Sequence, residues 1–402
     1  MQVKISKKFY SLYRKNYFFN RTVEMNEIIN TLNSRPCVNI ISGGNDTGKS
    51  MLLNHIFYES FPKIKLLNLI HVDFRKFPCN SVHDFANAIS KCTPKTYFQN
   101  LCDYLSDAEK VEVLGLINLE FYKKPEKFTF SDLNNMFLII EKATPLFMET
   151  KYTNVIFFDE VNMLNNLYKT EEGKLAAEYF FNWITLFTKQ SEKFHVFLGT
   201  SDSFFAHQIE KNLVNRFNFL TIGDLLYDEA YLYYQEEIKK YCPEKQEILK
   251  GLNFKNDIFE YVGGRIYHIN NAINDYASRG EKCIDSTIFN SVKTAYKDAF
   301  QIPDGKIGGI SFKNKKEWNN ETLRNTMKRI AKYGYTCYND KDDRVINELL
   351  SLTSCNLLNY RKKAPLKEDI IGLPKNDYPV FVSPSPIHHK IIKTIVEKDF
   401  EF

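Results

Sequence analysis

Residues 38–58 read VNIISGGNDTGKSMLLNHIFY, which joins an apolar run, a glycine-rich turn and a stretch with helical apolar spacing. The turn fits the pattern GxxxxGK[ST] between Gly43 and Ser50. Glycines let backbone N–H groups surround phosphate oxygens, and the N-terminus of the following helix adds its positive dipole end. The stretch therefore predicts a strand, a phosphate-binding loop (P-loop) and a helix, in that order.

The side chains of the P-loop have separate expected roles. We expect Lys49 to reach the β and γ phosphates of a nucleotide, and the Ser50 hydroxyl to bind Mg²⁺. The expected cofactors are therefore ATP and Mg²⁺. The candidate nucleotide-binding residues of the loop are Gly43, Gly44, Asn45, Asp46, Thr47, Gly48, Lys49 and Ser50.

A second motif, VIFFDE at residues 155–160, ends an apolar run with two acids. If the run is a buried strand, Asp159 lies at the carboxyl edge of the sheet beside the P-loop, where it can bind Mg²⁺. Glu160 follows directly and is placed to act as the general base on the attacking water. A strand that ends in two acids is often a solvated turn, but the P-loop upstream favours the metal and base roles.

Two further residues are candidates for catalysis. Thr200 ends the apolar run HVFLG, where a hydroxyl can sense the γ-phosphate; a helix N-cap is the structural alternative, and Ser201 and Asp202 are weaker candidates. Arg216 stands before the run FNFL and fits an arginine finger that reaches the nucleotide of a neighbouring copy, which would make the protein a homo-oligomer. A surface salt bridge is the alternative for Arg216.

Five short apolar runs alternate with helical patterns between residues 37 and 225, and this alternation is typical of a parallel sheet. We expect an α/β fold, a three-layer sandwich with a parallel five-stranded sheet. The expected domains are a P-loop core over residues 1–225, with a helical insertion at about 93–150, a helical lid over 226–304 and a C-terminal module over 305–402.

Composition excludes several classes of protein. Lys and Arg total 54 against 49 Asp and Glu, and this net charge of +5 is too small to identify a nucleic-acid binder by itself. The 8 cysteines show no zinc-site spacing and are expected as reduced thiols. No apolar run reaches the roughly 20 residues of a membrane span. We expect an intracellular, cytoplasmic protein with no membrane partner; a basic N-terminus leaves a mitochondrial location open, and a nuclear one is also an alternative.

The motifs taken together resemble the archaeal-type ATPase family in the STAND branch of AAA+-related proteins, and its fungal and protist relatives. The likeness covers about residues 15–300, and it rests on FFNRTVEMNEI, the P-loop, HVDFR, FFDE, FLGTSDSFF, NRFNFLTIGDL and YVGGR. It implies a P-loop NTPase core, a lid, and a winged-helix-like module after the lid, for which residues 320–395 are the candidate.

The resemblance also assigns two arginines to the nucleotide. It places Arg21 in the segment that packs near the adenine, although Asn20 stands where the family has glycine. It places Gly263, Gly264 and Arg265 at a lid turn that faces the nucleotide, with Arg265 as a sensor 2 contact, although Ile266 replaces the usual proline.

Three functions remain open from the sequence. The first is a switch that binds and hydrolyses ATP and couples nucleotide state to a macromolecular partner, with a protein as the expected partner. The second is a DNA-associated ATPase resembling origin-recognition or transposition helpers; residues 311–332, with seven basic and two acidic side chains, would contact duplex DNA. The third is a nucleotide-binding scaffold with little hydrolysis, which the intact pair Asp159 and Glu160 disfavours.

Overall fold

A parallel sheet of five strands forms the centre of the P-loop core, as the sequence predicted. Its strands are β1 (Val38–Ser42), β2 (Leu66–Asp73), β3 (Tyr152–Asp159), β4 (His195–Thr200) and β5 (Phe217–Thr221), in the order β2-β3-β4-β1-β5. The computed structural model describes residues 19–97, 106–107, 127–144, 151–213, 217–279, 286–302, 316–337, 343–362, 365, 369–370, 373 and 379–401.

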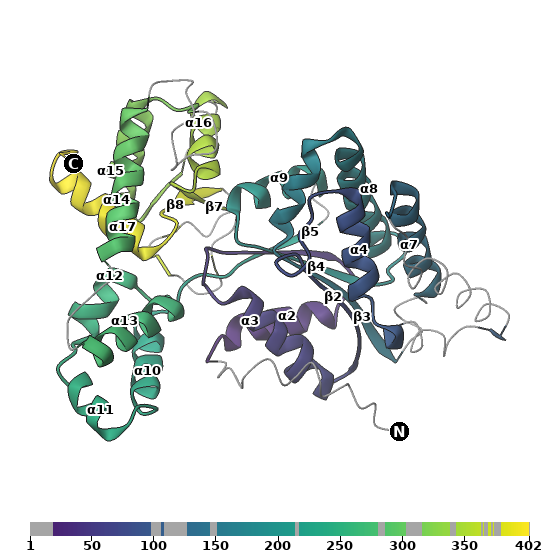
Figure 1. The fold of residues 1–402 in the computed structure, drawn as a ribbon, viewed down its shortest axis with the longest axis horizontal. Coiled ribbons are helices and arrows are strands. Elements are labelled where there is room, and N and C mark those ends of the chain that lie inside the picture. Colours follow the sequence, from purple (N-terminus) through teal and green to yellow (C-terminus); the bar gives the residue numbers. More distant parts are fainter. Residues whose placement is uncertain are drawn as a thin grey trace.

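Helices cover both faces of this sheet, so the expected three-layer sandwich is confirmed (Figure 1). On one face α2 (Thr22–Leu32), α3 (Lys49–His55) and the short turns η1 (Ile56–Ser60) and η2 (Phe61–Lys63) pack on the sheet. On the other face lie α4 (Val82–Cys92), α7 (Phe130–Ala143), η4 (Val161–Lys169), α8 (Glu171–Lys189) and α9 (Ser203–Leu213).

The strand order brings the candidate motifs together. β4 pairs with β1 on one side and with β3 on the other, so the strand that ends in Thr200 lies between the P-loop strand and the strand that ends in Asp159. β2 pairs with β3 so that Asp73 is the register partner of Asp159. Because parallel strands share one carboxyl edge, the loops after β1, β2, β3 and β4 meet there.

The lid is helical, as expected. It consists of α10 (Tyr227–Ile238), α11 (Pro243–Leu249), η5 (Phe254–Phe259), α12 (Glu260–Val262), α13 (Ile266–Arg279) and α14 (Ser286–Gln301). Trp318 of the following segment donates its indole N–H to the Ala299 carbonyl of α14 at 3.3 Å. The Tyr296 hydroxyl of α14 donates to the Leu357 carbonyl at 2.9 Å. The lid and the C-terminal module therefore share one hydrophobic cluster, and the expected boundary at 305 stays a prediction.

The C-terminal module combines helices with a small antiparallel sheet. Its elements are α15 (Asn320–Tyr333), β6 (Tyr335–Thr336), α16 (Asp343–Ser354), β7 (Asn359–Arg361), β8 (Val380–Val382) and α17 (Pro386–Glu397), and the strand order is β6-β8-β7. The apolar run PVFVSP at residues 379–384 predicts β8, but no pattern predicts the other two strands. A winged-helix-like module stays a prediction. Within the residues placed by the structure, no helix is long and apolar enough to cross a membrane.

Candidate functional site

The P-loop has the tight backbone that phosphate binding requires. Gly48 adopts φ 91°, a left-handed conformation that glycine favours, directly before α3. A Cβ at Gly43 would lie 2.4 Å from the Ile222 carbonyl oxygen, so a larger residue would push the loop away from the end of β5. Asn45 and Asp46 are exposed at the tip of the loop, whereas Gly43, Gly44 and Thr47 are buried.

Lys49 is a buried cation that points into the loop. Its Nζ donates to the carbonyl oxygens of Gly43 and Gly44, each at 2.9 Å. Burial lowers the pKa of Lys49 to about 8, while the carboxylates of Glu160 and Asp159 oppose that shift. The charge is thus held on partners that phosphate oxygens can replace, which agrees with the expected role of Lys49.

The two acids of the second motif lie at the carboxyl end of β3. Asp159 is 1% exposed, and burial raises the pKa of its carboxyl above the ordinary value. Glu160 adopts φ 54° and accepts a hydrogen bond of 2.8 Å from the Ser201 hydroxyl. Both carboxylates act electrostatically on Lys49, so the structure brings Asp159 and Glu160 to the P-loop as the spacing predicted.

Thr200 and Ser201, the sensor candidates at the end of β4, make different contacts. The Thr200 hydroxyl is buried and contacts Asn162 Oδ1 at 3.3 Å and the Asp202 carbonyl at 3.2 Å, while it accepts from the Asp202 backbone N–H. Ser201 is the hydroxyl that touches Glu160. Thr200 as a phosphate sensor stays a prediction, and Ser201 is the residue in contact with the candidate base.

Arg75 is a site residue that none of the sequence motifs predicted. It follows β2, and its guanidinium joins Asp73 to Asp159: Nε to Asp73 Oδ1 is 3.0 Å, and Nη2 to Asp159 Oδ2 is 2.5 Å. Burial alone would raise the pKa of Asp73, but hydrogen bonds from Arg75 outweigh it and the pKa is lowered. The stretch HVDFR carried the signal, since it places an acid and an arginine at the end of a strand.

Arg21 holds the P-loop through hydrogen bonds to backbone carbonyl groups. Its Nη2 donates to the carbonyls of Thr47 at 3.0 Å and Gly223 at 2.7 Å, and its Nη1 pairs with Glu24 at 2.9 Å. The guanidinium therefore fixes the loop to the segment that follows β5. Phe19 packs edge-on against Tyr233 of the lid, with ring centroids 5.3 Å apart. The segment expected near the adenine thus lies between core and lid, and adenine contact by Arg21 stays a prediction.

Arg265 lies against Gly44 of the P-loop, and its role as a sensor 2 contact stays a prediction. A Cβ at Gly44 would meet its Nη2 at 3.0 Å. The guanidinium forms two hydrogen bonds with Asp224, at 2.8 and 3.1 Å, and a third with the Pro384 carbonyl of the C-terminal module at 3.3 Å. Burial alone would raise the pKa of the Asp224 carboxyl, but the charge and hydrogen bonds of Arg265 outweigh burial, and the pKa is lowered.

The C-terminal module contributes a second ion pair to the same region. Arg361 forms two hydrogen bonds with Asp369, at 2.7 and 2.9 Å, and Asp369 also accepts from the Asp224 backbone N–H at 3.3 Å. These residues lie more than a hundred positions from the P-loop, so no local pattern marked them. One network of charges therefore runs from the C-terminal module through Asp224 and Arg265 to Gly44.

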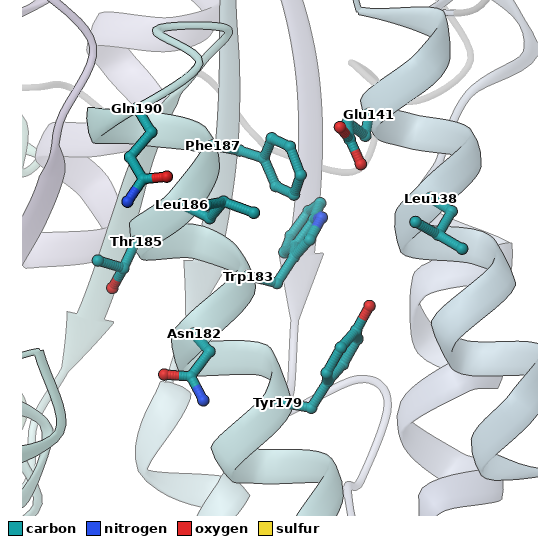
Figure 2. A pocket seen from close by; sticks show the side chains of 9 residues that line it. All are labelled: Leu138, Glu141, Tyr179, Asn182, Trp183, Thr185, Leu186, Phe187 and Gln190. Atoms are coloured by element: carbon teal, nitrogen blue, oxygen red, sulfur yellow. The ribbon is translucent and has the colours of Figure 1, made fainter.

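One expected site residue is not described by the structure, and a cavity lies away from the P-loop. Arg216 falls outside the residues that the structure describes, so its role stays a prediction. A cavity of about 400 Å³ lies between α7 and α8, where Figure 2 shows Leu138 and Glu141 across from Tyr179, Trp183 and Phe187. Both helices end shortly before β3 and β4 begin, so this cavity lies toward the amino edge of the sheet, away from the P-loop.

Comparison with known proteins agrees with this geometry. Residues 18–272 match a family described as an ATPase domain predominantly from Archaea, which is more than half of the 402 residues. The chain belongs to this family. An uncharacterized ATP-binding protein of Methanocaldococcus jannaschii is 26% identical to this ATPase over 286 residues, covering 65% of this chain and 70% of the relative. A second such protein of that organism is 23% identical over 332 residues, covering 72% and 89%.

The fold of this archaeal-type ATPase also occurs in a solved structure, a Walker-type ATPase of Pyrococcus abyssi. The TM-score is 0.50 at 14% identity, with 94% of this chain and 97% of that chain covered. At this identity the likeness shows the fold alone. Together with the family, it establishes an ATP-binding P-loop ATPase.

Proposed function

We propose that this ATPase is a switch, in which ATP binding and hydrolysis change the contacts of the C-terminal module and so act on a macromolecular partner. The observation that carries the proposal is the position of Arg265 against Gly44 of the P-loop, with hydrogen bonds to Asp224 and to the Pro384 carbonyl. Phosphate oxygens in the loop would compete for the same guanidinium. Nucleotide binding would therefore weaken a contact of the C-terminal module.

The residues at the carboxyl edge fit Mg²⁺ with the nucleotide. The Ser50 hydroxyl and the Asp159 carboxylate supply oxygen ligands, which are those that Mg²⁺ prefers, and they already contact the positive guanidinium of Arg75. When bound, the ion would supply positive charge to the phosphates. Glu160, next in the chain, would take the proton of the attacking water, with Ser201 fixing its carboxylate.

Limited proteolysis of the C-terminal module tests the coupling. In the wild-type protein ATP with Mg²⁺ should change the cleavage rate of residues 320–395, because the module loses its contact with Arg265. Arg265→Gln removes the charge for which phosphate and Pro384 compete. The Arg265→Gln variant should therefore still bind ATP through the P-loop, but residues 320–395 should be cleaved at the same rate with and without ATP. An ATP response that persists unchanged in Arg265→Gln would exclude Arg265 as the coupling residue.

Duplex DNA is the second candidate partner, and one surface favours it. On α15 the side chains of Arg324, Lys328, Arg329 and Lys332 are all exposed. Lys316 and Trp318 of the same basic segment are buried, and Lys316 Nζ donates to the Ile302 carbonyl at 3.0 Å. Among the described residues of this segment, the surface that would contact phosphates is therefore the outer face of α15.

If Arg216 also reaches a neighbouring copy's nucleotide, specific ATPase activity should rise with protein concentration.

A further inference from the structure

Arg75 lies between two buried carboxylates on neighbouring strands. Asp73 and Asp159 are register partners at the ends of β2 and β3, and their side chains are 8% and 2% exposed. Like charges directly opposite each other destabilise a sheet, and buried charges need a partner. Arg75 supplies that partner, since its guanidinium contacts both carboxylates.

The same guanidinium nitrogen also reaches the hydroxyl expected to bind Mg²⁺. Arg75 Nη2 is 2.5 Å from Asp159 Oδ2 and 3.5 Å from Ser50 Oγ. These are the two protein ligands proposed for the ion. Mg²⁺ takes its oxygen ligands at about 2.0–2.1 Å in nearly octahedral geometry. A guanidinium and the ion therefore cannot share the space between Ser50 and Asp159.

We propose that Arg75 holds the magnesium position while the protein is free of nucleotide, and is displaced from Asp159 when Mg²⁺ binds with the nucleotide. This inference rests on the proposed function. Asp73 is the residue that keeps Arg75 in place after displacement, because it accepts from the Arg75 backbone N–H at 3.1 Å and from Nε at 3.0 Å. The arginine side chain is 50% exposed, so it has room to move outward.

Displacement has a consequence for the order of binding. Without ATP, Mg²⁺ must displace the charge-assisted hydrogen bond between Arg75 and the buried Asp159 carboxylate. In return it gains oxygen ligands from the protein only. With ATP it also gains phosphate oxygens. Arg75 thus makes binding of the ion depend on the nucleotide, and it balances the charge of Asp159 in the absence of both.

Two variants of adjacent residues separate this role from the general effect of a lost charge. Arg75→Gln removes the cation that contacts Asp159. Lys76→Gln removes a cation from the next residue, whose Nζ lies 3.7 Å from Asp73 and whose side chain is 56% exposed. Lys76 thus pairs with Asp73, whereas Arg75 pairs with both Asp73 and Asp159. Lys76→Gln is therefore the matched control.

The first measurement is thermal melting of the full chain without nucleotide, in EDTA, in MgCl₂ and in NaCl of equal ionic strength. Arg75→Gln should melt below wild type in EDTA and recover stability in MgCl₂ but not in NaCl, since the ion can then enter the position that the guanidinium held. Wild type and Lys76→Gln should respond little to MgCl₂.

The second measurement is the Mg²⁺ concentration that gives half-maximal binding of a fluorescent ATP analogue. That concentration should fall roughly ten-fold in Arg75→Gln, because the ion no longer displaces a hydrogen bond to a charged group. It should stay at the wild-type value in Lys76→Gln.

Three results would overturn the proposal. One is that Arg75→Gln lowers the melting temperature and MgCl₂ does not restore it, which would mean that Arg75 serves only to join β2 and β3. Another is an unchanged Mg²⁺ requirement. The third is weaker analogue binding in EDTA and in Mg²⁺ alike, which would make Arg75 a nucleotide contact. If wild type binds no analogue, the proposed function fails, and melting in MgCl₂ without nucleotide still decides the role of Arg75.

Discussion

The Lys49 ammonium group donates to two carbonyl oxygens of its own loop, those of Gly43 and Gly44, and we expect phosphate oxygens to replace them when ATP binds. Lys49→Ala should lower ATP affinity by roughly 10- to 100-fold or more, the range expected for lost hydrogen bonds to a charged group. Titration with a fluorescent ATP analogue measures this, with circular dichroism to show that the variant is folded. Unchanged affinity in a folded variant would refute the P-loop assignment.

Glu160→Gln keeps the shape of the side chain and removes the base. The variant should bind ATP as wild type does and lose turnover by about 10²- to 10⁴-fold, the usual contribution of a general base. Steady-state phosphate release measures this. Glu192→Gln is the matched control, because Glu192 lies at the opposite edge of the sheet, shortly before β4, and pairs with the exposed Arg35. Turnover near the wild-type rate in Glu160→Gln would show that another group is the base.

Among single residues, the sequence predicted those that stand at a fixed spacing within one motif. It missed residues whose contacts depend on the direction of a side chain. Gly43 to Ser50 and the pair Asp159 and Glu160 follow from motifs within one strand and its loop. Ser201 instead of Thr200 touches Glu160, because the Thr200 hydroxyl at the end of β4 contacts Asn162 and the Asp202 carbonyl. Arg75 reaches Asp159 across a strand pair whose register is not written in the local sequence.

Among the elements, the turn Gly263–Gly264 positions Arg265 through close backbone contact. A Cβ at Gly264 would lie 1.8 Å from the Leu225 carbonyl oxygen, so the turn and the linker after β5 would have to separate. Gly264→Ala should cost about 1–3 kcal/mol of unfolding free energy, as overpacking does, and should reduce the ATP response of the C-terminal module. Chemical denaturation measures the loss.

Gly251→Ala is the control for that change. A Cβ there would meet the Tyr276 hydroxyl at 2.7 Å, which is the end of a side chain and can move aside. We expect a smaller loss in this variant. Equal losses in the two variants would indicate a general lid effect and not the contact between Gly264 and Leu225.

The outer face of α15 carries the prediction for DNA. Changing Lys328, Arg329 and Lys332 together to Glu should abolish binding of duplex DNA and leave basal ATPase activity intact. In the unaltered protein log affinity should fall with log salt at a slope of about −0.9 per phosphate neutralised. Lys239, Lys245 and Lys250, also exposed but on the lid, give the matched triple control. No binding by wild type at low salt would remove DNA as the partner.

Helices and strands with a long, clear apolar pattern were predicted from the sequence, and two very short strands were not. The five core strands were expected, because buried strands leave clear apolar runs. β6 and β7, with two and three residues, were not expected. Strands so short have no detectable alternation, and they form because β8 pairs with both of them.

Across the whole molecule, the described part of the C-terminal module contacts the core, and these contacts were not visible in the sequence. Besides the network through Arg265, α16 and β7 lie against α9. The Tyr360 hydroxyl of β7 donates to Glu210 at 2.9 Å, and the Tyr360 backbone N–H donates to the Ser203 hydroxyl at 3.1 Å. The partners are separated by 150 and 157 positions. Contacts of this range depend on the packing of separate elements, which no motif records.

The distance between core and C-terminal module in solution shows whether the nucleotide moves the module. Spin labels on Leu175 of α8, which is 58% exposed, and on exposed Asn325 of α15 would be introduced as unnatural amino acids, since the chain contains 8 cysteines. In the Glu160→Gln variant, ATP with Mg²⁺ should shift the distance distribution, and the same addition to Lys49→Ala should not. An identical distribution with and without ATP in Glu160→Gln, under conditions where it binds ATP, would contradict the switch.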